Sequence, residues 1–129
     1  MMWFPRMLDK IRLQALGDLH PDYHPNLGRA VAMDGRCLNF LRIKFEDLKN
    51  RVAQGGTDEE ILEWCIQNGR RPNDEEIEVW NGFILKRGWR DKGSAELAET
   101  KKREGLGDRD DIQTFVDYHD VDEGRTPRR

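Results

Sequence analysis

The fold of this 129-residue chain is decided by the stretch from Thr57 to Trp89, TDEEILEWCIQNGRRPNDEEIEVWNGFILKRGW. Two helix-start signals lie in it. Thr57 and Asn73 can each cap a helix with a side-chain oxygen, and each is followed three positions later by a glutamate that can return the bond. Gly69 and Gly88 are expected to end the two helices by adopting the left-handed conformation. The stretch therefore predicts two consecutive, well-delimited helices.

The second of these helices is expected to form the centre of the core, because its apolar face is unusually wide. One stripe consists of Ile77, Trp80 and Ile84, and Val79 with Phe83 forms a neighbouring stripe. Glutamates near its start and basic residues near its end also agree with the helix dipole.

Apolar spacing, capping residues and glycine stops predict five further helices. They are placed at about Pro5–Leu16, from a capping residue at Asp34, around 45–52, at about Ser94–Glu104, and from Asp108 or Asp110 onwards. The first should bury Met7, Leu8, Ile11 and Ala15. The last should carry Ile112 and His119 on one face, which gives His119 a packing role. The sequence thus predicts an all-α protein, a compact bundle of six to seven short helices.

Residues 18–33 break this pattern and are expected to form one long irregular loop, with a short extended piece around residues 29–32. Pro21 and Pro25 lie in it among polar residues. By length, the chain should form a single helical domain over residues 1–121. Residues 122–129 lack apolar anchors and should fray as a C-terminal tail.

Composition argues against several classes of protein. The formal net charge of −3 argues against nucleic-acid binding driven by overall charge, although basic clusters flank Trp89. No apolar run approaches the ~20 residues of a membrane span, and polar residues interrupt any signal peptide at the N-terminus. Cys37 and Cys65 lack the spacing of a disulfide framework and should be reduced and metal-free. These features predict a cytoplasmic protein without a membrane segment, metal or cofactor.

Several segments resemble the bacterial domains of unknown function catalogued as family number 5069. They are FPRMLDKIR at 4–12, MDGRCLNFLRI at 33–43, TDEEILEWCIQNG at 57–69 and, as in the longer members, GDRDDIQTFVDYHDVDEGR at 107–125. Arg42 departs from the family pattern, which implies a small residue there. The resemblance implies a small bacterial protein and carries over no catalytic residues.

The sharpest polar cluster lies in the first predicted helix. Arg6 and Lys10 are four residues apart and so share a helical face, where they could hold a phosphate or carboxylate. Asp9 could pair with Arg6 or Arg12. We therefore predict a ligand-binding set for an anion that also draws on the following loop and helix: Arg6, Asp9, Lys10, Arg12, Tyr23 and Asp34. In this anion site Arg6 and Lys10 should lie together on the side opposite the apolar face. The alternative for the cluster is a salt-bridged helix surface, or Asp9 and Arg12 tying this helix to its neighbours.

Other candidate sites fit known chemistry less well. His20, Asp22 and His24 could be metal ligands, but two prolines restrict their loop and their spacing is not that of a zinc site. The His119–Asp120 doublet occurs in metal-dependent phosphohydrolases, which also need a histidine well before the doublet and an aspartate well after it; here only Asp122 follows, two residues beyond Asp120. The acidic residues from 117 to 123 lack the pattern of a calcium loop and are expected to form a solvated helix end.

No glycine-rich phosphate loop or activated nucleophile is apparent, and both cysteines lie among apolar residues. The leading hypothesis is a non-enzymatic binding or regulatory module that recognises a protein partner or a small anionic ligand. The alternative is an enzyme whose dispersed polar site is built around the first helix and the loop at 18–34, from Arg6, Asp9, Lys10, Tyr23 and Asp34.

Overall fold

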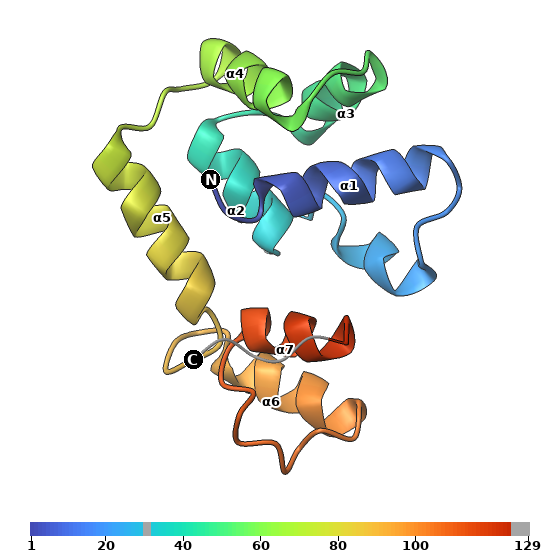
Figure 1. Cartoon of the computed structure of the whole chain (residues 1–129), viewed down its shortest axis with the longest axis vertical. Helices are drawn as coiled ribbons and strands as arrows, with labels where there is room; N and C mark the ends of the chain where they lie inside the picture. The colour runs from blue at the N-terminus through green and yellow to red at the C-terminus, as the bar shows by residue number, and fades with distance from the viewer. Residues whose placement is uncertain (30–31, 125–129) are drawn as a thin grey trace. The chain divides into compact units, whose positions relative to one another are not determined.

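The computed structural model describes residues 1–29 and 32–124, and in these ranges the chain forms seven α-helices and one short 3₁₀ helix without any β-strand (Figure 1). The all-α prediction is confirmed. The chain divides into two compact units, Met1–Ile77 and Glu78–Arg129. The single domain over residues 1–121 stays a prediction. None of the helices in the described ranges combines the length and the apolar character needed to cross a bilayer.

The first unit is organised around α1 (Phe4–Ala15), which packs against α2 (Met33–Leu41), α3 (Phe45–Ala53) and α4 (Asp58–Asn68) (Figure 1). Apolar side chains at helical spacing from all four helices form its core, including Met7, Leu8, Ile11, Leu38, Leu41, Leu48 and Ile61. Ala15, predicted to be buried, is exposed because it lies in the last turn of α1, beyond the packed helices.

The loop between α1 and α2 is less irregular than predicted, because Pro21–Asn26 form the 3₁₀ helix η1. Proline is well suited to the first turn of such a helix, where its missing N–H would have no partner in the helix. Residues 30 and 31, within the predicted extended piece, lie outside the described residues.

The predicted start of α4 is confirmed. The Thr57 hydroxyl accepts from the Glu60 N–H and the Glu60 carboxylate accepts from the Thr57 N–H, both at 3.2 Å. The helix ends at Gly69 as predicted, but the predicted left-handed conformation is wrong, because Gly69 has a φ of −111°. A side chain there would collide with the Leu41 carbonyl oxygen. Glycine is therefore required by the close approach of two backbone segments.

The next helix, α5 (Asp74–Lys86), also begins with the predicted pair. The Asn73 side chain accepts from the Glu76 N–H at 2.8 Å, and Glu76 Oε1 accepts from the Asn73 N–H at 2.9 Å. Trp80 and Ile84 are buried as predicted. Val79 is 67% exposed, so the buried face of α5 is narrower than the sequence indicates.

The second unit contains most of α5, then α6 (Ser94–Arg103) and α7 (Phe115–Asp122). Gly88 has the predicted positive φ, at +100°. Its lack of a side chain also allows Leu97 and Phe115 to pack against it, because a Cβ there would lie 2.9 Å from the Leu97 side chain and 3.1 Å from that of Phe115. The Phe115 N–H donates to the Arg87 carbonyl at 2.8 Å. These contacts anchor α6 and α7 to the end of α5.

The last helix begins later than predicted, because the Thr114 hydroxyl caps it by accepting from the Asp117 N–H at 3.1 Å. Ile112 therefore lies outside the helix and does not share a helical face with His119. The inward-facing residues of α7 are Asp117 and Asp120, so the expectation of a solvated acidic end is wrong for these two, whereas Asp122 and Glu123 are exposed. Asp117 is buried because its carboxylate accepts from the Gln113 N–H at 2.9 Å. Of the predicted tail, residues 125–129 lie outside the described residues.

Candidate functional site

The first unit contains a buried polar cluster centred on Asp34 in the first turn of α2. Its carboxylate accepts from the Lys10 ammonium at 2.8 Å to both oxygens, from the Trp3 indole N–H at 2.8 Å and from the Gly28 N–H at 3.1 Å. The Asp34 side chain is completely buried. These bonds connect the start of α1, the loop and α2 through one carboxylate.

Two predictions are corrected by this cluster. Lys10 does not lie with Arg6 on an outward face of α1, because the Lys10 side chain turns inward and forms an ion pair with the buried carboxylate of Asp34. Asp34 does not cap its own helix, since its oxygens are occupied by donors from other segments. The pair Lys10–Asp34 is therefore an internal clamp.

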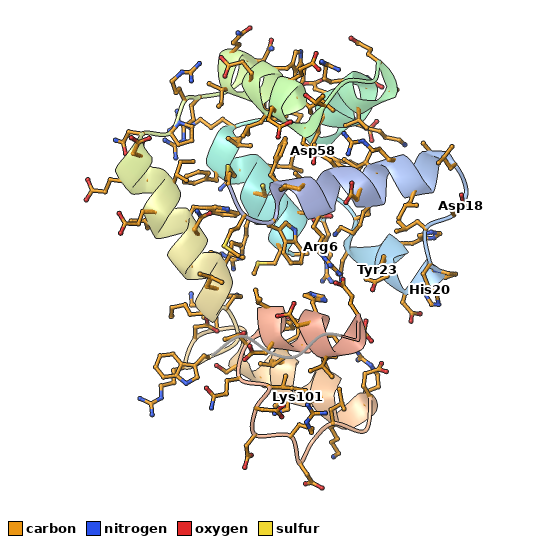
Figure 2. All side chains as sticks on the ribbon, viewed as in Figure 1. Arg6, Asp18, His20, Tyr23, Asp58 and Lys101 are labelled. Atoms are coloured by element: carbon orange, nitrogen blue, oxygen red, sulfur yellow. The ribbon has the colours of Figure 1, made fainter. Side chains whose placement is uncertain are left out.

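Arg6 and Tyr23 lie beside this clamp. The Arg6 guanidinium carbon is 5.4 Å from the centre of the Trp3 ring and 5.9 Å from that of Tyr23 (Figure 2). Lys10 is 5.3 Å from the Trp3 ring. Four of the six predicted site residues thus gather in one place, together with Trp3, which the sequence analysis missed. The one feature of the sequence that could have indicated Trp3 is its position, because an indole N–H donor directly precedes a helix that carries cations.

The other two predicted residues, Asp9 and Arg12, lie on the surface. Arg12 contacts Asp9 at 3.2 Å and reaches Asp58 at the start of α4 at 2.7 Å. This arrangement matches the alternative to an anion site, because the surface is salt-bridged and Arg12 also ties α1 to α4. The enzyme built from the first helix and the following loop stays a prediction, and two of its members, Lys10 and Asp34, neutralise each other.

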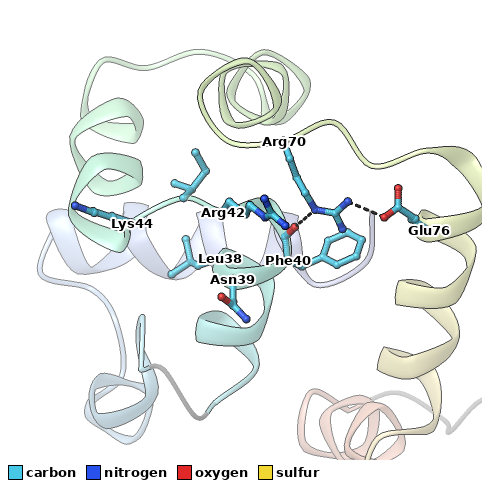
Figure 3. A pocket seen from close by; sticks show the side chains of 8 residues that line it. Leu38, Asn39, Phe40, Arg42, Lys44, Arg70 and Glu76 are labelled. Carbon is cyan, nitrogen blue, oxygen red and sulfur yellow. Dashed lines mark hydrogen bonds and ion pairs between the residues drawn. The ribbon is translucent and has the colours of Figure 1, made fainter.

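A pocket of about 660 Å³ lies at the other end of α2 (Figure 3). It is open and mostly polar, and none of its lining residues belongs to the predicted site. They come from the end of α2, the segment that follows it, and the residues around the start of α5: Leu38, Asn39, Phe40, Arg42, Ile43, Lys44, Arg70 and Glu76.

Arg70 is fixed in this pocket by three contacts. Its Nε donates to the Phe40 carbonyl at 2.7 Å, its Nη1 donates to Glu76 Oε2 at 2.7 Å, and its guanidinium lies 4.5 Å from the centre of the Phe40 ring (Figure 3). The Arg70 N–H also donates to the Leu41 carbonyl at 3.1 Å. The close approach of Gly69 to the end of α2 makes this placement possible.

Arg42 ends α2 in the left-handed conformation, with φ 60° and ψ 45°. Glycine is the usual residue for this position because a Cβ makes the conformation costly. The side chains of Arg42 and Lys44 are exposed and form no hydrogen bond or ion pair with any residue that the structure describes. The pocket is therefore lined by three cations and one carboxylate, that of Glu76, in a chain of net charge −3.

The loop histidines serve local structure. The His20 ring accepts from the Asp22 N–H at 3.1 Å, and His24 Nε2 lies 3.0 Å from the Leu19 carbonyl. Across residues 1–29 and 32–124, the structure contains no group of three histidine, cysteine or acidic residues arranged to hold a metal ion.

Cys37 and Cys65 are both buried free thiols. Burial raises the pKa of Cys65 to about 12, and burial with the nearby Asp34 carboxylate raises the pKa of Cys37 well above its usual value. Because the thiolate is the reactive form, neither should act as a nucleophile.

We expect both thiols to react with a disulfide reagent at least about 100-fold more slowly in the native protein than in urea, because reaction requires opening of the core. Colorimetric thiol titration with and without denaturant measures this difference. Rapid modification of one thiol in the native protein would contradict its assignment as an inert core residue.

Comparison with known proteins confirms the family resemblance. The profile of the family described as "Domain of unknown function (DUF5069)" matches residues 1–125. No curated protein and no solved structure matches the chain significantly.

Proposed function

Since the chain belongs to the DUF5069 family, whose description assigns no activity, we propose a function from the side chains alone: a non-enzymatic module that binds a small anionic ligand in the pocket at the end of α2. The contacts around Asp34 favour a structural role for the first helix, and we therefore place the anion site in this pocket instead of at Arg6 and Lys10. The two buried free cysteines support a reducing compartment, the bacterial cytoplasm, as its place of action.

The observation that carries the proposal is Arg42. It lines the pocket with Arg70 and Lys44, and its own charge is not neutralised by any side chain in the described parts of the chain. Planar guanidinium groups bind carboxylate and phosphate through two parallel hydrogen bonds, so two arginines on one pocket form a suitable anion site.

The backbone of Arg42 supports the same proposal. A left-handed arginine costs about 1 kcal/mol or more relative to glycine, which would fit the end of α2 without strain. Strained positions of this kind are concentrated at functional sites. We infer that the chain retains the arginine because its guanidinium is needed at the pocket.

We expect wild-type protein to bind inorganic phosphate saturably at constant ionic strength. Arg42→Gln should weaken this binding about tenfold or more, because it removes a hydrogen bond between two charged groups. Titration followed by ¹H–¹⁵N NMR gives the affinity and locates the shifts. Lys49→Gln is the matched control, because Lys49 is an exposed cation on α3 outside the pocket. Equal weakening by both substitutions, or no saturable binding by wild type, would overturn the proposal.

Arg42→Gly separates function from stability. Glycine relieves the left-handed strain but adds freedom to the unfolded chain, so we expect a net gain of roughly 0.5 kcal/mol in the free energy of unfolding. Phosphate binding should be lost to the same extent as in Arg42→Gln. Urea denaturation measures the first effect. A destabilised glycine variant would mean that the Arg42 side chain supports the fold.

A further inference from the structure

Glu76 connects the pocket to the start of α5 by using its two carboxylate oxygens differently. Oε2 accepts from Arg70 at 2.7 Å, whereas Oε1 accepts from the Asn73 N–H at 2.9 Å and completes the cap of α5. The two side chains are both partly exposed, at 26% for Arg70 and 40% for Glu76. Solvent and a ligand can therefore reach this ion pair.

We propose that Glu76 is an internal competitor for Arg70, which a dianionic ligand displaces when it binds. The inference rests on the proposed function of the pocket as an anion site. In the structure, Glu76 holds the same type of contact that a ligand carboxylate or phosphate would make with Arg70 (Figure 3). Its affinity for Arg70 then sets the threshold that a ligand must exceed.

Arg70 can exchange its anion without losing its position. Its Nε bond to the Phe40 carbonyl and its contact with the Phe40 ring involve neither Glu76 nor a ligand. A guanidinium has five N–H donors, of which the Phe40 and Glu76 bonds use two. Glu76 can in turn remain on the Asn73 N–H through Oε1 when Oε2 is released.

Charge points to a dianion. With Glu76 in place, the three cations Arg42, Lys44 and Arg70 leave the pocket with an excess of two positive charges. A doubly charged phosphate monoester or a dicarboxylate matches this excess charge. A dianion can also compete with the Glu76 carboxylate for the Arg70 guanidinium more strongly than a monoanion can.

Glu76→Gln tests the competition. A glutamine oxygen can still accept from the Asn73 N–H, so the cap of α5 is kept while the negative charge at Arg70 is removed. We expect this variant to bind inorganic phosphate about three- to fivefold more tightly than wild type, the worth of a partly exposed ion pair. Glu63→Gln is the matched control, because Glu63 forms a 2.6 Å ion pair with Arg71 and does not line the pocket. Its affinity should change less than about twofold.

The same NMR titration is run with phosphate, succinate and acetate. Tighter binding of phosphate or succinate than of acetate supports the dianion assignment, and the order of the first two distinguishes a phosphate group from a dicarboxylate. Acetate binding as tightly as both dianions would overturn that assignment. If Arg42→Gln weakens phosphate binding as expected but Glu76→Gln binds phosphate no more tightly than wild type, the competition is refuted and the proposed function stands. If no variant binds any of the three anions, both fail.

Discussion

Replacing Asp34 by alanine is expected to lower the free energy of unfolding by about 3–5 kcal/mol, the cost of removing one partner from a buried ion pair. The substitution leaves the Lys10 ammonium in the interior without the carboxylate that is paired with it. It also removes the acceptor of the Trp3 indole and of the Gly28 N–H. Urea denaturation followed by circular dichroism measures the loss.

Asp9→Ala is the matched control on the same helix bundle. Asp9 pairs with Arg12 at 3.2 Å in solvent, so its removal should cost under about 1 kcal/mol. The double replacement of Lys10 by methionine and Asp34 by leucine should recover part of the loss of Asp34→Ala, since no charge then remains buried. A loss below about 1 kcal/mol for Asp34→Ala would show that the cluster is not a clamp.

Local signals explain how much of the fold could be predicted. The capping pairs at Thr57 and Asn73 act within one helical turn, so the starts of α4 and α5 follow from residues three positions apart. The late start of α7 was missed because Thr114, which caps it, lies between apolar residues that matched a longer helical period.

Tertiary contacts explain why the candidate site in the structure differs from the predicted one. Spacing places Arg6 and Lys10 on one face of α1, but it cannot show that Asp34, 24 residues further on, draws Lys10 inward. The pocket joins Arg42 to Arg70, which are far apart in sequence and follow no motif.

The pocket itself depends on a glycine, and Gly69→Ala is expected to cost roughly 3 kcal/mol, at the upper end of the range for over-packing. The new methyl group would collide with the Leu41 carbonyl oxygen and would also lie 3.0 Å from the Cys65 carbonyl oxygen and 3.1 Å from that of Arg42. Backbone atoms cannot rotate away as a side chain can. The two segments must therefore separate, which also breaks the bond from the Arg70 N–H to Leu41.

Gly82→Ala is expected to have the opposite effect on the free energy of unfolding. Gly82 lies inside α5, and a Cβ there would meet no atom within 4 Å. Alanine should therefore stabilise the chain by roughly 0.5–1 kcal/mol, because it favours the helix over the unfolded state. Urea denaturation of both variants compares the signs directly. If Gly69→Ala were as stable as wild type, the close approach of residue 69 to the end of α2 would be refuted, and with it the placement of Arg70 beside Arg42.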